Sequence, residues 1–313
     1  MNIETLRIFC DVVQHQSFSR GAAANDVSQS AATQSVHRLE RHFDVQLVDR
    51  SKRPLVVTPE GQLCFEGFRE VLELYDSVEA RVRSLRMEIT GVVRVAAIYS
   101  VGLHHMTQCM QDFMRRYPKA KVRLEYQRPA RVYEQVLGSE VDLGIVSYPD
   151  SSPDISVVPW RKERMVLVCS PSHPLAEETS ITAEQLAGQS FVAFDRDLSI
   201  RKEIDRHLRT RSVEIDVAME FDNVETIKQA VAIGAGVSIL PEPTVKNEVR
   251  SGTLVTVRVI APELERPLGI IHRPRKVFTP TAAKFVEVLR EAERSEEAVA
   301  GPLAVGAASS DDG

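Results

Sequence analysis

Apolar residues recur at intervals of three and four from the first turn of the chain: Ile3, Leu6, Phe9, Val12 and Val13. This spacing predicts a helix over residues 4–14. Ser19 suits the N-cap of a short second helix over 20–24, and Ser28 suits that of a third helix over 29–43. The third helix has an apolar stripe that we expect to be buried: Ala32, Val36, Leu39 and Phe43. A short helix, a tight turn and a longer helix together predict a helix-turn-helix motif.

Two short apolar runs follow, over 45–48 and 55–58, and predict a pair of strands. The segment that joins them, 49–54, holds three cations against one acid. A basic hairpin beside a helix-turn-helix is a wing, placed to touch the DNA backbone or the minor groove next to the helix.

The exposed face of the third helix carries the chemistry of this segment: Gln29, Ser30, Thr33, Gln34, His37 and Arg38. Amide, hydroxyl, imidazole and guanidinium groups are those that reach base edges and phosphates in a major groove. An ordinary solvated helix face is the alternative, and the neighbouring wing favours DNA. We expect Gln29 and Gln34 to contact base edges. The remaining contacts, to phosphates or the minor groove, are expected mostly from Ser28, Thr33, Arg38, Lys52 and Arg53, and Arg50 completes the candidate interface.

A long helix is predicted over 59–88, where no proline interrupts the chain after its first residue. Its apolar residues step by three and four and form a heptad seam: Phe68, Val71, Tyr75, Val78, Val82 and Leu85. The seam predicts that this helix pairs with a second copy, because helix-turn-helix proteins usually dimerise to bind paired half-sites. The alternative is an amphipathic helix that packs on its own domain.

Strands alternate with helices beyond residue 91, which predicts an α/β fold with largely parallel sheets. The expected strands are 92–98, 121–126, 141–146, 166–169, 191–194, 217–221, 237–240 and 268–272. The expected helices are 103–117, 132–137, 200–210, 224–233 and 280–293. The tail from residue 296 is rich in Ala, Gly and Ser without periodicity, so we expect it to be disordered.

Polar residues follow several of these strands, where ligands of such sheets bind against helix N-termini that favour anions. Ser199 is expected to cap one of these helices, and the pair Asp222-Asn223 another. The candidate ligand residues are Tyr99, Ser100, Val101, Gly102, Arg128, Ser147, Ser199, Ile200 and Asn223.

Composition and charge change this picture only in part. With 313 residues, 43% apolar and 27% charged, the chain has the balance of a soluble globular protein of two or three domains. The net charge of −5 argues against nucleic acid, but residues 1–58 hold 7 Lys and Arg against 6 Asp and Glu. Four separate cysteines predict reduced thiols. No signal peptide or membrane-length apolar run is found, which predicts a cytoplasmic protein without a membrane partner.

Several motifs over about sixty residues resemble the LysR-type transcriptional regulators. They are Ser17-Phe18-Ser19-Arg20-Gly21-Ala22-Ala23, Val27-Ser28-Gln29-Ser30-Ala31, Arg38-Leu39-Glu40, Leu47-Val48-Asp49-Arg50 and Leu55-Val56-Val57-Thr58-Pro59-Glu60-Gly61. The chain departs from the family pattern at Ser30, Gln34 and Val48, where the family usually has proline, arginine and phenylalanine.

The resemblance implies an N-terminal winged helix-turn-helix (1–58), a long linker and dimerisation helix (59–90) and a two-lobed, periplasmic-binding-protein-like α/β sensor domain (91–295). It places lobe I at 91–161 and 267–295 and lobe II at 162–266. It also implies a homodimer or homotetramer that binds double-stranded promoter DNA, with RNA polymerase as a further partner. A small-molecule effector would bind in the cleft between the lobes, and an anionic effector is our hypothesis. No cofactor, metal site or enzymatic activity is expected.

Other signals in the chain do not support a different chemistry. Gly234-Ala235-Gly236 follows a predicted helix, so it fits a helix end better than a dinucleotide fingerprint. His104 and His105 are adjacent and point in different directions on a helix, and Asp142 at the start of a strand is expected to be structural. Two rival classes are a solute-binding protein, which would need a signal peptide, and a cytosolic enzyme with an accessory DNA-binding domain.

Overall fold

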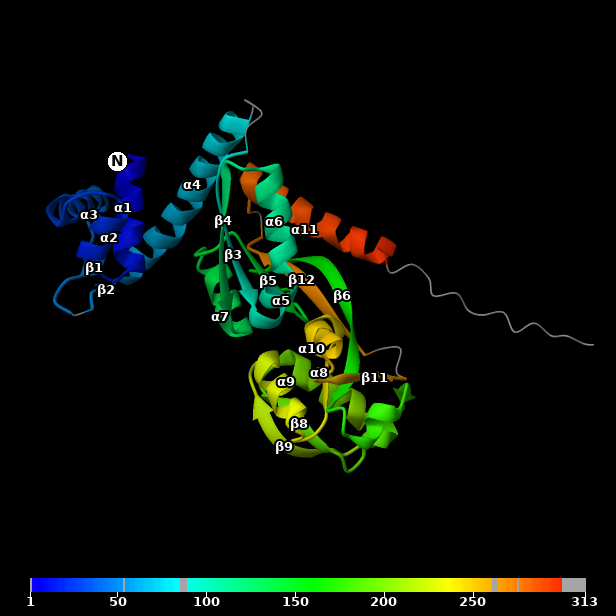
Figure 1. The fold of residues 1–313 in the computed structure, drawn as a ribbon. Coiled ribbons are helices and arrows are strands. Elements are labelled where there is room, and N and C mark those ends of the chain that lie inside the picture. Colours follow the sequence, from blue (N-terminus) through cyan, green and yellow to red (C-terminus); the bar gives the residue numbers. More distant parts are fainter. Residues whose placement is uncertain (1, 53, 85–88, 261–263, 275, 300–313) are drawn as a thin grey trace, which may run out of the picture. The chain divides into compact units, whose positions relative to one another are not determined.

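The computed structural model describes residues 2–52, 54–84, 89–260, 264–274 and 276–299. The chain forms two compact units, one of residues 1–89 with the segment 277–280 and one of residues 90–276 with the remainder (Figure 1). Each unit has its own apolar core.

Unit one is built from four helices and a short hairpin. The helices are α1 (Ile3–Gln14), α2 (Phe18–Ala24), α3 (Gln29–Phe43) and α4 (Pro59–Ser84). The hairpin consists of β1 (Val48–Asp49) and β2 (Val56–Val57), paired antiparallel. Phe9 and Val12 of α1 are fully buried against Ala32 and Val36 of α3. At Gly21 of α2 a Cβ atom would lie 2.6 Å from a side-chain carbon of Val12, so glycine permits the close approach of α1 and α2.

Local details of unit one differ from the sequence predictions. The N-cap of α2 is Ser17, whose hydroxyl accepts a hydrogen bond from the Arg20 backbone, whereas Ser19 lies inside the helix. Phe43, expected in the buried stripe of α3, is 39% exposed because it lies on the last turn of the helix. The hairpin strands have two residues each and are shorter than predicted.

Unit two has two lobes. Lobe I contains a sheet in the order β4-β3-β5-β12-β6, and Figure 1 shows α7 on one side of it and α6 with α11 on the other. Its strands are β3 (Gly91–Ile98), β4 (Ala120–Gln127), β5 (Leu143–Ser147), β6 (Ser156–Cys169) and β12 (Glu265–His272). Its helices are α5 (Tyr99–His104), α6 (Met106–Arg116), α7 (Pro129–Leu137) and α11 (Pro280–Val299).

Lobe II is built around the second half of β6. Its other strands are β7 (Ser180–Ile181), β8 (Ser190–Phe194), β9 (Asp216–Phe221), β10 (Ser238–Pro241) and β11 (Val255–Val259). Its helices are α8 (Ser199–Arg209), α9 (Val224–Ala232) and α10 (Lys246–Ser251), with short 3-10 turns at 174–177, 183–186 and 242–245. A single large apolar core fills the lobe.

Two strands connect the lobes. β6 pairs with β12 up to Arg164 and with β10 from Met165 onward, so one continuous strand runs through both lobes. β12 returns beside it and begins at Glu265. The predicted crossings near 161 and 267 therefore fall within strands, next to a bulge at Leu268 and Gly269, because β6 continues from its pairing with β12 to its pairing with β10.

The prediction of largely parallel sheets was wrong in part. The pairs β3·β4, β3·β5 and β8·β9 are parallel, but β12, β10 and β11 each run antiparallel to β6. The alternation of strands and helices predicts the three parallel pairs. It does not predict that β10, β11 and β12 run antiparallel to β6. β7 and β11 were not predicted.

Two predicted helices also differ. The single helix expected over 103–117 is two helices, α5 and α6, divided at His105. α11 extends to Val299, so residues 296–299 are helical rather than disordered; the rest of the tail lies outside the described residues. Gly234 follows the C-cap of α9 with a φ of +82°, which confirms its assignment to a helix end. Asp142 accepts a hydrogen bond from the Arg94 backbone, the structural contact expected for it.

Candidate effector cavity and DNA-facing surface

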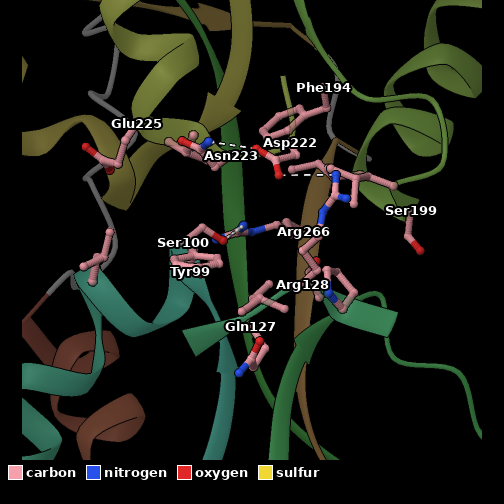
Figure 2. A pocket seen from close by; sticks show the side chains of 17 residues that line it. Tyr99, Ser100, Gln127, Arg128, Phe194, Ser199, Asp222, Asn223, Glu225 and Arg266 are labelled. Atoms are coloured by element: carbon pink, nitrogen blue, oxygen red, sulfur yellow. Dashed lines mark hydrogen bonds and ion pairs between the residues drawn. The ribbon is translucent and has the colours of Figure 1, made fainter. Parts of the chain in front are cut away.

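A cavity of about 470 Å³ lies between the two lobes of unit two (Figure 2). Its walls are the first turns of α5, α7, α8 and α9, and each of these helices begins within a few residues of the strand before it. The strands β3 and β4 from lobe I and β8 and β9 from lobe II all end at the cavity. Parallel pairing places such strand ends at one edge, where helix N-termini meet the ligand.

Arg266 is the central polar group of the cavity and is only 1% exposed. Its Nη1 donates to the Ser100 hydroxyl at 2.9 Å, and its Nε donates to Glu163 Oε2 at 2.6 Å. Figure 2 shows the Arg266 side chain directed at Ser100 across the cavity. The position is set by the two connecting strands, since Arg266 is on β12 and Glu163 on β6. A buried cation needs such a partner to stay charged.

Glu163 is the carboxylate that holds this cation. Burial opposes its ionisation, but the charge of Arg266 and the hydrogen bond from His105 outweigh burial and lower the pKa of Glu163 from 4.5 to about 2. Arg161 donates to Nδ1 of His105 at 2.8 Å, so the ring proton lies on Nε2 and points at Glu163. The guanidinium of Arg161 in turn lies 4.5 Å from the ring centre of Trp160. A buried hydrogen-bonded chain therefore leads from the cavity into lobe I.

Arg128 lies at the mouth of the cavity and reaches from lobe I to lobe II. Its Nη2 lies 3.2 Å from Asp195 and 3.3 Å from Asp222, which follow β8 and β9. Figure 2 shows the contact between Arg128 and Asp222 as a dashed line. Two carboxylates of one lobe thus share one guanidinium of the other.

A second contact between the lobes joins His104 of α5 to Glu225 of α9 at 3.1 Å. Burial and the charge of Lys228 lower the pKa of His104, against the opposing effect of Glu225. Lys228 is itself buried and bonded to Glu225 at 2.9 Å and to Glu248 at 2.8 Å. The two adjacent histidines thus bond different partners, and no group of potential metal ligands is found among the described residues.

Most of the predicted ligand residues meet in this cavity. Those that line it are Tyr99, Ser100, Arg128, Ser147, Ser199, Ile200 and Asn223. Val101 and Gly102 do not line it, because both are buried within α5; a Cβ at residue 102 would lie 2.1 Å from the Tyr126 ring. Ser199 does not cap α8, whose N-cap is Leu198, whereas Asn223 caps α9 through the Thr226 backbone.

Asp222 was predicted only as a helix cap, and Pro129 is the neighbour of the predicted Arg128. The lining residues that were not predicted are Ile98, Leu103, Gln127, Phe194, Leu198, Val224, Glu225 and Arg266. Most of them lie within one or two positions of a predicted strand end or of a predicted ligand residue, so the rule that ligands bind at strand ends could have included them. Arg266 could not be included, because its place beside Ser100 depends on the antiparallel return of β12.

The candidate DNA contacts lie on α3 and the hairpin of unit one. Those with exposed side chains are Ser28, Gln29, Ser30, Gln34, His37, Arg38, Arg50 and Lys52. Thr33 is half-buried, and its hydroxyl donates to the Gln29 carbonyl at 2.9 Å. Ser28 caps α3 through the Ala31 backbone. Arg53 lies outside the described residues.

Two of these side chains have partners that restrict their orientation. Ser19 donates to Oε1 of Gln29 at 2.8 Å, so this bond uses the amide oxygen and not the amide N–H groups. Arg50 donates to Glu40 at 2.6 Å, bonds His37, and lies 5.3 Å from the ring centre of Phe18. Arg50 therefore joins the hairpin to α3 in addition to any contact with DNA.

The predicted seam of α4 divides into two groups. Phe68 packs on the core of unit one, with its ring centre 5.8 Å from that of Phe9, so it belongs to the domain core and not to a seam. Leu85 lies outside the described residues. An exposed apolar row remains along the helix: Leu63, Val71, Leu74, Tyr75, Val78 and Val82. Leu63 and Leu74 were not predicted.

Two family models match the chain. One, described as "Bacterial regulatory helix-turn-helix protein, lysR family", matches residues 3–62, and the other, described as "LysR substrate binding domain", matches residues 86–294. The HTH-type transcriptional regulator YfeR of Shigella flexneri is 30% identical over 290 residues, which are 93% of this chain and 94% of that protein. The HTH-type transcriptional regulator YeiE of Escherichia coli is 29% identical over 92% of this chain and 96% of its own length.

Solved structures have the same fold over nearly the whole chain. Full-length OxyR from Pseudomonas aeruginosa gives a TM-score of 0.75 at 24% identity and covers 94% of this chain and 95% of its own. Full-length CbnR complexed with its target DNA gives a TM-score of 0.61 at 21% identity, with 93% and 100% coverage. Among the described residues, no helix has both the length and the apolar character to cross a membrane.

Proposed function

Since this chain belongs to the LysR family and is a DNA-binding transcriptional regulator with an effector-binding domain, we propose that a small anion binds in the interlobe cavity and controls how α3 and the hairpin occupy promoter DNA. The observation that carries the proposal is the hydrogen bond from the buried Arg266 to the half-buried Ser100 hydroxyl in the cavity wall.

Two features of the cavity favour an anion. First, α7 and α8 begin at the cavity without a side-chain cap, so apart from Pro129, which has no N–H, the backbone N–H groups of their first turns are available to an anion. Second, the carboxylates that line the cavity already have cationic partners, Asp222 in Arg128 and Glu225 in Lys228. A ligand anion would therefore meet the backbone N–H groups of these helix N-termini and little repulsion from the paired carboxylates. The apolar residues of the cavity would cover the rest of the ligand.

Thermal unfolding of the full chain tests the anion proposal. We expect small carboxylates or oxyanions to raise the Tm in a concentration-dependent manner, and Ser100→Ala to reduce that rise. Ser152→Ala, an exposed serine outside the cavity, is the matched control and should respond as the native chain does. A rise caused only by cations or neutral apolar compounds would contradict the proposal.

On the DNA side, we propose Gln29 and Gln34 as base-edge contacts and the hairpin cations as phosphate contacts, with RNA polymerase as a further partner. The exposed position of both glutamines on α3 supports the first part. We also propose that the exposed apolar row of α4 pairs two copies of the chain. A gel-shift assay on the intergenic DNA upstream of the chain's own gene tests the DNA contacts: we expect a sequence-specific complex, which a solute-binding protein would not form.

A further inference from the structure

We propose that Arg128, Asp195 and Asp222 form an electrostatic latch that holds the two lobes of unit two together when no effector is bound. Arg128 follows the last strand residue of β4 in lobe I. Both aspartates belong to lobe II, and their carboxylates lie 3.2 and 3.3 Å from the same guanidinium nitrogen. The three charges therefore join the lobes across the mouth of the cavity.

The fold brings the two aspartates together, and among the described residues the ion pairs of both carboxylates are with Arg128 of the other lobe. β8 and β9 are parallel neighbours in register at Phe194 and Phe221, and one aspartate follows each strand. The Asp195 backbone N–H donates to the Phe221 carbonyl at 2.9 Å, which keeps the two strand ends side by side. Two adjacent carboxylates repel each other, and the cation from lobe I relieves that repulsion only when the lobes are close.

A second contact between the lobes, from His104 to Glu225, also favours the closed state. His104 of lobe I bonds Glu225 of lobe II at 3.1 Å, and in Figure 2 Glu225 and the Arg128–Asp222 pair lie on opposite sides of Arg266. Contacts on both sides resist a hinge opening about the strands β6 and β12.

The strength of the latch suits a switch. The side chains of Arg128, Asp195 and Asp222 are 55%, 33% and 43% exposed, so solvent and salt weaken their attraction. A ligand can shift an equilibrium between closed and open lobes only if two free energies compare suitably. The free-energy difference between the two states must be smaller than the difference in the ligand's binding free energy to them. The latch favours the closed state without fixing it.

Distance measurements between the lobes test the latch directly in the absence of effector. Spin labels are attached at Asp154→Cys in lobe I and Arg209→Cys in lobe II, both exposed, in a Cys64→Ser background. Labelled chains are diluted into an excess of unlabelled full-length chain, so that only pairs within one chain contribute. We expect Arg128→Gln, and Asp195→Asn combined with Asp222→Asn, to lower the closed-to-open ratio by about twofold to fivefold, as expected of partly exposed ion pairs.

Two further variants make the measurement decisive. Arg131→Gln removes a cation from α7, the helix that follows Arg128. The partners of Arg131, Glu134 and Glu140, lie in lobe I, so the distances should not change. The double exchange Arg128→Asp with Asp222→Arg brings opposite charges together again, so its closed population should be higher than that of Arg128→Gln and close to that of the native chain. Raising the salt from about 0.1 M to about 1 M should open the native chain and leave Arg128→Gln unaffected.

The latch is contradicted if Arg128→Gln and Arg131→Gln give the same distances as the native chain, or if the charge exchange opens the lobes further. Because no effector is added, the result does not depend on the anion proposal. If no stabilising anion is found, the distances between the lobes still show whether the latch exists.

Discussion

Arg266 and Glu163 show how one residue pair serves both the fold and the cavity. Arg266 presents one guanidinium nitrogen to Ser100, while Glu163 takes the others and accepts a further hydrogen bond from His105. The pair lies on the two strands that connect the lobes, so the cation is fixed where the lobes meet. Removal of one partner would leave the other charge buried and uncompensated.

The lowered pKa of Glu163 makes this pair a pH-dependent source of stability. A carboxylate whose pKa is lower in the folded state than its ordinary 4.5 stabilises the fold above that value and loses the contribution as the pH falls toward its folded pKa of about 2. We therefore expect the difference in unfolding free energy between the native chain and Glu163→Gln to shrink by roughly 3 kcal/mol between pH 5 and pH 2. Denaturant unfolding at fixed chain concentration measures it. A difference that stays constant over this range would show that Glu163 is not held ionised by Arg266.

Gln29 is the residue for which the DNA proposal makes its sharpest prediction. Ser19 fixes its carbonyl oxygen, so the amide is oriented before DNA binds. Gln29→Ala should relax preference at one base position by about 1–3 kcal/mol. Selection from randomised sites measures this, with Gln62→Ala on α4 as the control. An unaltered preference for Gln29→Ala would exclude Gln29 as a base contact.

Among the elements, the hairpin is expected to act through charge alone. Lys52→Ala with Arg53→Ala should weaken binding to all DNA sequences to a similar extent. It should also reduce the slope of log K against log salt by about 1 for each phosphate that the hairpin no longer neutralises. Lys121→Ala with Lys246→Ala removes the same charge from exposed positions of unit two and serves as the control. If both double variants keep the native slope, the hairpin does not hold phosphates.

The exposed row of α4 predicts the oligomeric state. Val78 is 50% exposed in the single chain, and a second copy would bury it in an apolar seam. Val78→Asp would place a charge in that seam, so light scattering should report monomers. Gln62→Glu adds a negative charge to the same helix outside the row and should leave the oligomer intact. A Val78→Asp chain that stays dimeric would mean that α4 does not pair the chains.

What the sequence could predict at this scale follows from the range of the interactions involved. Helices α1, α3, α8 and α9 were placed almost to the residue, because apolar periodicity and capping residues act within a few positions. The break between α5 and α6 was missed because His105 turns inward to Glu163, a residue far along the chain. The antiparallel return of β12, and with it the position of Arg266, is a long-range pairing that local pattern does not encode.

For the whole molecule, the distribution of charge matters more than its sum. The chain carries −5, but residues 1–58 hold 7 cations and 6 acids, so the acidic excess lies in the linker and sensor. A DNA-binding domain that is nearly neutral attracts DNA weakly without sequence recognition. Affinity should then depend on pairing of two domains and on specific contacts.

The most direct test of this account is the affinity of the full-length chain for the DNA upstream of its own gene, measured with and without the anion that most raises its Tm. Fluorescence anisotropy at fixed salt gives both affinities. We predict that the anion changes the affinity or the protected footprint of the native chain and that Ser100→Ala shows a reduced change. Identical affinity and footprint with and without an anion that stabilises the chain would contradict the claim that the cavity controls DNA binding.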